Sequence, residues 1–365
     1  MENKKVKLLV VSNMYPSEKY PHYGVFVENT VKVLRRAGYP VTVAAMKKAD
    51  GKVRKLLSYA GFYLRVVFSG IFGRYGAIYA HYASHTALPL LIVKALRRTK
   101  LIMNVHGNDV VPETPEDTRF LPLTNRVLQK AQWVVCPSPY FREQVISRFA
   151  VPKEKIFVYP SGGVDTELFC KGSRALAAAQ FSLPEQKRYV GFVSRIEASK
   201  GWDLFLRAGA GILGRHPEVC LIAVGSGAQE NEFSRLADDL GIRDRLQTYP
   251  LLSQQALVQI FNLLDVFVFP TNRESESLGL VGLEAMACQT VTVLPDRFGP
   301  SGYGKDGENA LCFRAGDAAD LERVMEKALS CDAEALGQNA RRTALAYSHS
   351  ATDRLLLDFF RDILP

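Results

Sequence analysis

Residues 270–293 read PTNRESESLGLVGLEAMACQTVTV. The apolar, β-branched run just before them, Asp265 to Pro270, is short enough for a buried strand. Leu280 to Ala287 carries apolar residues at helical spacing, so it predicts a helix. The polar loop between these elements contains Glu276 and Gly279. Because the first turn of a helix has N–H groups without intrahelical partners, a strand, loop and helix N-terminus of this kind predict an anion-binding site.

Glu276 and Glu284 stand eight residues apart in this stretch. Two acidic residues at such a spacing usually mark the solvated face of a helix. The string around them, ESLGLVGLEAMA, resembles the E-x7-E signature of the retaining glycosyltransferases of family 4, which have two Rossmann-like domains (the GT-B fold). The resemblance implies that Glu276 contacts hydroxyls of the donor sugar and that Glu284 contacts the ribose. It also implies that backbone N–H groups at Leu278, Gly279 and Leu280 meet the sugar or a phosphate.

A second string follows the predicted strand Tyr189 to Val193 and includes Arg195, Lys200 and Gly201. It reads SRIEASKGWD and resembles the family's G-R-x4-K-G-x-D string, which implies that Arg195 and Lys200 hold the donor diphosphate. Fixed cations stabilise the charge that a departing nucleoside diphosphate gains, as a metal ion would. We therefore expect no metal site and no cofactor besides the sugar nucleotide. The alternative is a pair of surface cations at a strand end.

Three further positions complete the set of candidate site residues. By resemblance, Gly24 lets backbone approach the donor, because a Cβ there would block a ligand; the alternative is an ordinary turn glycine. His106, in the string HGND, is the histidine expected to contact the donor sugar or the acceptor, with His81 and His85 as weaker candidates. Gly225 follows another predicted strand, and its glycine-rich string lacks the third glycine of an NAD fingerprint. It is expected to let the nucleotide pass close to the strand end.

Length and spacing predict two domains, because 365 residues exceed the usual single core. The resemblance implies an α/β fold of two Rossmann-like domains, with an interdomain cleft and a C-terminal crossover helix. The expected limits are 1–170 for an acceptor-binding domain, 171–345 for a nucleotide-sugar-binding domain, and 346–365 for a helix that returns to the first domain. The six cysteines form no CxxC pair, which suits a reducing cytosol. The basic start at Lys4 and Lys5 leads into a first strand rather than a signal peptide.

Charge is distributed unevenly along the chain. Residues 1–170 contain 25 Lys/Arg and 12 Asp/Glu, a net charge of +13, whereas the remainder carries −4. Lys52 to Tyr75 mixes basic with apolar and aromatic residues and predicts an amphipathic helix that binds an anionic membrane. The alternative is a helix that packs its apolar side on the sheet of the first domain. Nucleic acid is not an expected partner, because no stacking motif accompanies the basic residues.

Together these strings predict a retaining, metal-independent glycosyltransferase that uses a nucleotide-diphosphate sugar, a UDP-sugar before a GDP-sugar. The expected acceptor is a glycan or a lipid-linked molecule in the synthesis of a cell-surface polysaccharide. We expect a cytoplasmic protein at the inner face of the cell membrane. A nucleotide-sugar 2-epimerase of the same fold and a non-catalytic sugar-nucleotide-binding subunit are the alternatives.

Overall fold

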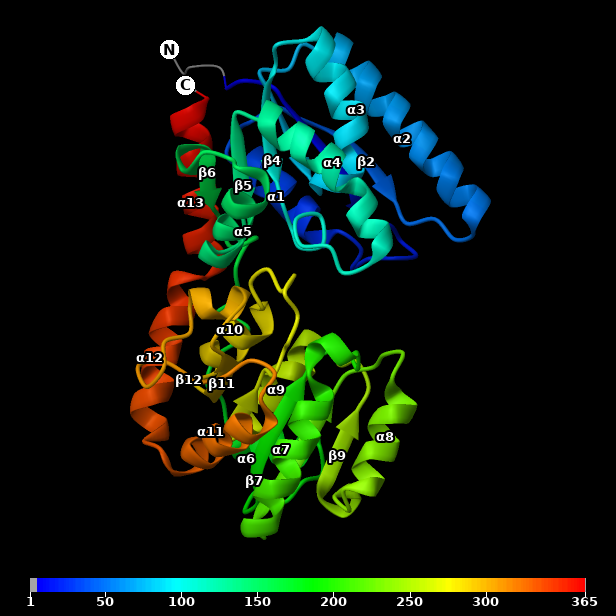
Figure 1. Ribbon diagram of the computed structural model, residues 1–365. Helices are drawn as coiled ribbons and strands as arrows, with labels where there is room; N and C mark the ends of the chain where they lie inside the picture. Colours follow the sequence, from blue (N-terminus) through cyan, green and yellow to red (C-terminus); the bar gives the residue numbers. More distant parts are fainter. Residues whose placement is uncertain (1–4, 365) are drawn as a thin grey trace. The chain divides into compact units, whose positions relative to one another are not determined.

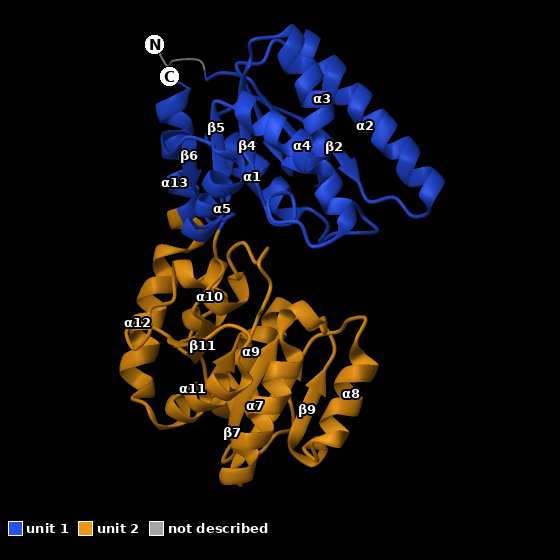
Figure 2. Cartoon of the chain, in the orientation of Figure 1, with its two compact units in different colours: residues 1–162, 352–365 blue, residues 163–351 orange. Residues whose placement is uncertain are grey.

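The computed structural model describes residues 5–364; residues 1–4 and 365, including Lys4 of the basic start, lie outside the described residues. The chain forms two compact units (Figure 2). Unit 1 comprises the described residues up to Gly162 and those from Thr352 onward, and unit 2 runs from Gly163 to Ala351. Each unit is built on its own parallel sheet of six strands, which confirms the predicted α/β class with two Rossmann-like domains.

Unit 1 has the strand order β2-β1-β3-β4-β5-β6, with all pairs parallel (Figure 1). Its strands are β1 (Leu8–Tyr15), β2 (Val41–Lys47), β3 (Ala77–His81), β4 (Lys100–Asn104), β5 (Trp133–Cys136) and β6 (Ile156–Val158). Its helices are α1 (Val25–Arg36), α2 (Lys52–Phe72), α3 (Ala83–Leu96), α4 (Pro115–Lys130) and α5 (Pro139–Phe149), with a 3₁₀ turn at Lys153–Lys155. The order reverses between β1 and β3, and ligands of such sheets bind where the order reverses, at the carboxyl ends of the strands.

The two faces of this sheet are covered by different helices, because successive side chains of a strand point to opposite faces. Helices α2 to α5 pack on the face that carries Leu9 and Val11. Helix α1 and the C-terminal helix α13 (His349–Ile363) pack on the face that carries Leu8 and Val10. Phe359 of α13 stacks on Phe157 with ring centroids 4.1 Å apart. The last helix of the chain is therefore part of the core of unit 1.

Two element boundaries in unit 1 depend on contacts with distant segments. Strand β1 continues to Tyr15, which pairs with Lys47 after an irregularity. Helix α3 begins at Ala83. Its first N–H, at Ala83, donates to the carboxylate of Asp109 at 2.9 Å. Local sequence gives no sign of a cap that comes from 26 residues further along the chain.

Unit 2 has the strand order β12-β11-β10-β7-β8-β9, again with all pairs parallel. Its strands are β7 (Arg188–Val193), β8 (Val219–Val224), β9 (Leu246–Tyr249), β10 (Val266–Val268), β11 (Val291–Pro295) and β12 (Leu311–Phe313). Its helices are α6 (Arg174–Gln180), α7 (Trp202–Arg215), α8 (Glu230–Asp239), α9 (Gln254–Leu263), α10 (Leu280–Ala287), α11 (Ala318–Ser330) and α12 (Ala333–Ala346). Short 3₁₀ turns lie at Ala198–Lys200, Arg243–Arg245 and Gly299–Gly302. The order reverses between β7 and β10, the strands that precede the two strings of candidate site residues.

Gly201 holds the loops after β7 and β10 together. It has a φ of +71°, and a Cβ added there would lie 2.0 Å from the carbonyl oxygen of Pro270. In addition, Asn272 N–H donates to the Ser199 carbonyl at 3.0 Å. Only glycine fits both the left-handed backbone and this contact.

We predict that Gly201→Ala destabilises unit 2 by about 3 kcal/mol, because it combines backbone strain with a backbone clash. The matched control is Gly214→Ala in α7, where a Cβ meets no atom within 4 Å, and which should stabilise the unit by about 0.5–1 kcal/mol. Fluorescence of Trp202 in a Trp133→Phe background reports the unfolding of unit 2. Equal unfolding midpoints for the two variants would refute the packing role of Gly201.

Candidate functional site

The centre of the candidate site in unit 2 is an ion pair between Lys200 and Glu276. Lys200 ends the 3₁₀ turn after β7, and Glu276 lies in the loop between β10 and α10. The Lys200 Nζ lies 2.5 Å from Glu276 Oε2, and the two side chains are only 8% and 11% exposed. A buried charge that loses its partner is costly, so each of the two residues depends on the other.

Thr271 is part of this centre, although the sequence did not single it out. Its side chain is fully buried, and its Oγ1 lies 3.2 Å from Glu276 Oε2 and 3.3 Å from the Ser199 carbonyl oxygen. A hydroxyl at the end of a buried strand is a polar group that must find partners. That requirement is the signal in the sequence that could have indicated Thr271.

The N-terminus of α10 follows directly. Gly279 caps it with a φ of +80°, and a Cβ there would lie 2.6 Å from the ring of Phe269. The Gly279 carbonyl accepts a hydrogen bond from the buried Tyr303 hydroxyl at 2.8 Å. Within residues 5–364, no acceptor is paired with the backbone N–H of Leu278, Gly279 or Leu280. These three donors can therefore bind an anion or sugar hydroxyls.

Glu284 lies one turn into α10, and its environment differs from that of Glu276. Burial raises the pKa of its carboxyl to about 7. Across the described part of the chain, no hydrogen-bond donor or cation is paired with this carboxylate. Glu276 and Glu284 both lie close enough to Tyr303 to raise the pKa of its hydroxyl, after burial as the first cause. A half-buried carboxylate without a partner can accept hydrogen bonds from hydroxyl groups of a ligand.

Arg195 and Gly225 lie at the ends of the neighbouring strands β7 and β8. The Arg195 side chain is 56% exposed and forms an ion pair with Glu197 at 2.6 Å. It shares the β7–α7 loop with Lys200 but is not part of the buried pair. Gly225 has a φ of +146°, and a Cβ there would lie 1.8 Å from the Ser194 carbonyl oxygen. Backbone packing against the residue before Arg195 therefore requires this glycine.

In unit 1, His106 and His81 meet at the reversal of strand order. His81 Nδ1 and His106 Nε2 lie 3.1 Å apart, and one of them donates to the other, depending on the tautomers. Burial lowers the pKa of His106 to about 3, and burial, followed by the nearby His106, lowers the pKa of His81. Both rings are therefore neutral at physiological pH. Tyr82 stacks on His106 with ring centroids 5.1 Å apart.

Several buried polar atoms at this end of the sheet have no hydrogen-bond partner among the described residues. Buried atoms that lack a hydrogen bond within residues 5–364 include His81 Nε2, Asn13 Oδ1 and Asn104 Oδ1. All three side chains lie at or near the carboxyl ends of strands, where a ligand of the sheet would bind. The loop is held by Asp109, whose carboxylate accepts from the N–H groups of His106, Gly107 and Ala83 at 2.9–3.0 Å.

Gly24 and His85 are the remaining candidates in unit 1. Gly24 precedes α1 with a φ of +75°, and a Cβ there would lie 2.6 Å from the carbonyl carbon of Met14. The close approach at Gly24 is thus an approach of the chain to itself. His85 stacks between Tyr59 and Phe120, which gives it a packing role. The structure gathers Lys200, Glu276, Glu284 and the start of α10 in unit 2, and His81 with His106 in unit 1.

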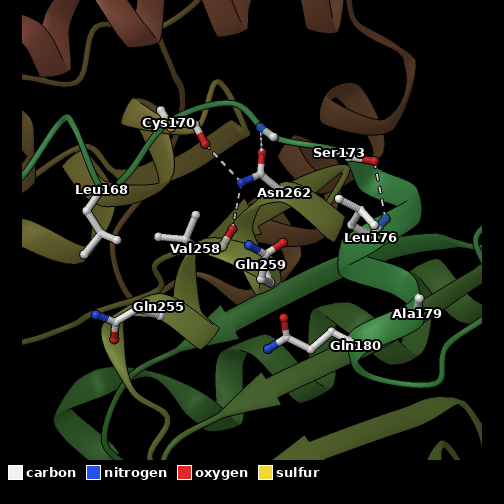
Figure 3. A pocket seen from close by; sticks show the side chains of 11 residues that line it. Leu168, Cys170, Ser173, Leu176, Ala179, Gln180, Gln255, Val258, Gln259 and Asn262 are labelled. Carbon is white, nitrogen blue, oxygen red and sulfur yellow. Dashed lines mark hydrogen bonds between the residues drawn. The ribbon is translucent and has the colours of Figure 1, made fainter.

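A groove in unit 2 lies apart from these residues, between α6 and α9 (Figure 3). It has a volume of about 790 Å³ and is lined by uncharged side chains, including Gln180, Gln255 and Gln259. Asn262 in its wall already bonds to backbone atoms of Cys170, Gly172 and Val258. A groove without charged residues is a poor site for a diphosphate, so we assign it no role in the predicted chemistry.

The fold is that of the GT-B glycosyltransferases. Sucrose-phosphate synthase from Thermosynechococcus elongatus superposes with a TM-score of 0.80 at 20% identity, over 98% of this chain and 99% of that one. The HepE protein of Anabaena, crystallised in complex with UDP, superposes with a TM-score of 0.77 at 17% identity, over 98% and 100% of the two chains.

The family follows from the sequence comparisons. The family model described as glycosyl transferases group 1 matches residues 173–343, and the model described as glycosyltransferase family 4 matches residues 23–168. The chain belongs to the group 1 glycosyltransferases of the family 4 type, which confirms the resemblance found in the sequence. D-inositol 3-phosphate glycosyltransferase of Mycolicibacterium smegmatis is 33% identical over 239 residues, which is 65% of this chain. The match spans 54% of that relative's length.

We predict that Glu284→Gln stabilises the protein in a pH-dependent way. A carboxyl group whose pKa is raised on folding makes the folded state lose stability as pH rises from its ordinary value of 4.5 to about 7. The variant lacks this loss. The difference in free energy of unfolding between the variant and the wild type should therefore grow through that window to at most about 3 kcal/mol and then stay constant. Urea unfolding across the pH range measures the difference. The control is Glu334→Gln at an exposed site; if both variants show the same pH curve, burial of Glu284 is not the cause.

We also predict that Lys200→Met costs about 3–5 kcal/mol of stability, because it leaves the Glu276 carboxylate buried without its cation. The double variant Lys200→Met/Glu276→Leu should recover most of this loss, since it buries no charge. Arg195→Met removes a cation from an exposed pair in the same loop and should cost less than about 1 kcal/mol. A double variant as unstable as the single one would contradict the dependence of the two residues on each other.

Proposed function

We propose that the protein is a retaining, metal-independent glycosyltransferase that transfers a sugar from a UDP-sugar to a glycan or lipid-linked acceptor. The observation that carries the proposal is the buried Lys200–Glu276 pair, 2.5 Å long, beside the unpartnered N-terminus of α10. Membership of the group 1 glycosyltransferases supports the class of reaction. The complex of HepE with UDP favours uracil as the base of the donor.

In the proposed mechanism, Lys200 and the free N–H groups of Leu278 to Leu280 bind the diphosphate and offset the charge that it gains on departure. Arg195 reaches the same anion by exchanging its exposed partner Glu197, a change that a surface ion pair permits at low cost. Glu284 accepts hydrogen bonds from the ribose hydroxyls. Its raised pKa means that this interaction is strongest above about pH 7, where the carboxyl is ionised.

Glu276 has the second task of binding the donor sugar. Thr271 and Lys200 both hold its Oε2, so its other oxygen, Oε1, is the one left for sugar hydroxyls. We propose attack by the acceptor on the same face from which the diphosphate leaves, with the departing phosphate taking the proton of the acceptor. Covalent attack by Glu276 is the alternative route to retention.

His106 is the proposed contact from unit 1 to the donor sugar or the acceptor. Because its pKa is lowered to about 3, it acts as a neutral donor or acceptor of hydrogen bonds and not as a cation. We further propose that the acceptor belongs to cell-surface polysaccharide synthesis and is used in the cytoplasm, at the inner face of the cell membrane. D-inositol 3-phosphate, which the name of the Mycolicibacterium relative contains, should be tested as an acceptor as well.

We predict that the purified protein hydrolyses or transfers from UDP-sugars faster than from GDP-sugars, and that EDTA leaves the rate unchanged. The product anomer, followed by NMR, should keep the configuration of the donor. Glu276→Gln is the matched inactive control, because it keeps the shape of the side chain and removes its charge. An inverted product, or activity abolished by EDTA, would overturn the proposal; an epimerised sugar still attached to UDP would assign an epimerase instead.

A further inference from the structure

One segment of unit 1 is basic without any acidic residue. From Gly51 to Asn108 the sequence contains nine Lys/Arg and no Asp or Glu. None of these nine cations forms an ion pair with another of the residues 5–364. The segment contains α2 and α3, which lie side by side (Figure 1). Unpaired cations that are not neutralised within the protein favour an anionic partner.

Helix α2 is apolar on two sides. Phe62 and Val66 are buried in the core of unit 1, at 2% and 0% exposure. A second stripe of large apolar side chains faces solvent, each at least 66% exposed: Val53, Leu56, Leu57, Leu64, Phe68 and Phe72. Val53, Leu57, Leu64, Phe68 and Phe72 are separated by four or seven residues, and Leu56 follows Val53 by three, which places all six along one side of the helix. The packing of one apolar side on the sheet therefore leaves another apolar side without a partner among the described residues.

Helix α3, which packs against α2, also carries exposed apolar side chains. Leu88, Ile92 and Leu96 recur every four residues and are 44%, 43% and 64% exposed. The two helices are in close contact, because a Cβ added at Gly70 of α2 would lie 2.6 Å from a methyl group of Val93. That contact brings the C-terminal half of α2 alongside the part of α3 that carries Ile92 and Leu96. We name these six side chains of α2 and three of α3 the α2–α3 surface.

We propose that the α2–α3 surface docks on an anionic lipid membrane and inserts its apolar side chains among the acyl chains. Large exposed apolar patches mark interaction sites, and basic residues beside one are typical of a helix that lies in a charged interface. Lys52, Arg54 and Lys55 at the start of α2 would contact the lipid headgroups, with Arg97 and Arg98 after α3. A second copy of the chain fits this surface less well, because the same unpaired cations would face one another.

This inference rests on the proposed function for its purpose, since docking would bring a lipid-linked acceptor to unit 1. It does not depend on a helix that crosses the bilayer: among residues 5–364, no helix is long and apolar enough to do so. Interfacial binding of this kind combines two contributions, apolar insertion and attraction of cations to anionic headgroups. Each contribution can be removed separately by mutation.

Co-sedimentation with vesicles of phosphatidylcholine, with and without phosphatidylglycerol, tests the proposal on the full-length protein. We expect binding to the anionic vesicles that weakens as NaCl rises from about 0.1 M to about 0.5 M. The variant Lys52→Gln/Arg54→Gln/Lys55→Gln should lose about a hundredfold in affinity, since each near-surface cation contributes close to a factor of five. The variant Leu64→Gln/Phe68→Gln/Phe72→Gln should lose at least about tenfold.

Matched controls come from exposed residues of unit 2. Leu176→Gln/Leu251→Gln/Leu345→Gln changes side chains that are 71%, 80% and 45% exposed, and Arg207→Gln/Arg235→Gln/Lys327→Gln removes three exposed cations. Both controls should bind vesicles as the wild type does. Circular dichroism should show native helix content for every variant, because each substitution lies at an exposed position.

Three outcomes would overturn the docking surface. They are binding that is indifferent to phosphatidylglycerol, α2 variants that bind like the wild type, and a lipid-free dimer that the Leu64/Phe68/Phe72 variant dissociates. Hydrolysis of UDP-sugars in the absence of lipid is measured in parallel. Intact hydrolysis with no vesicle binding refutes the docking surface alone, whereas vesicle binding without hydrolysis refutes the proposed donor chemistry alone.

Discussion

Unit 2 depends on the close backbone approach between Gly201 and Pro270. At this point the loops after β7 and β10 meet, at the one place in the sheet where the strand order reverses. The contact leaves no room for a Cβ, and it fixes Lys200 on one loop against Glu276 on the other. The charged centre is therefore a consequence of backbone packing: the ion pair can be short and buried because the two chain segments are already held together.

The two glutamates of the site illustrate opposite ways to bury a carboxylate. Glu276 has a cation and a hydroxyl as partners, whereas Glu284 has neither among residues 5–364, and burial raises the pKa of Glu284. A charge left without a partner in the folded protein is a cost to stability. Such a cost is reasonable where a ligand supplies the missing donors, and the hydroxyl groups of a ribose would do so. The same reasoning applies to the unpartnered nitrogen of His81 in unit 1.

Much of the architecture could be predicted from the sequence, because buried parallel strands and the helix at Leu280 to Ala287 give strong local patterns. Helix α10 has the predicted limits. What local patterns could not give were contacts between distant segments. The start of α3 depends on Asp109, and the environment of Glu276 depends on Thr271. Similarly, the resemblance indicated Gly24 and a glycine-rich string indicated Gly225, but neither showed that the tight contact at each glycine is with the protein's own backbone.

Periodicity was least informative for α2, because a helix with apolar residues on two sides has no single stripe to assign. The sequence left open whether that apolar character is buried or exposed, and the structure shows both.

The positive charge of unit 1 comes from its lysine and arginine residues. The histidines at its sheet edge are neutral, so they do not supply the net charge of +13 found in residues 1–170. The nine cations between Gly51 and Asn108, which form no ion pair among residues 5–364 and have no acidic residue beside them in the sequence, supply part of it. The cations of α2 and α3 are separate from the neutral pair His81 and His106, and they accompany exposed leucine and phenylalanine side chains. This arrangement suits an extended anionic surface better than a single bound phosphate.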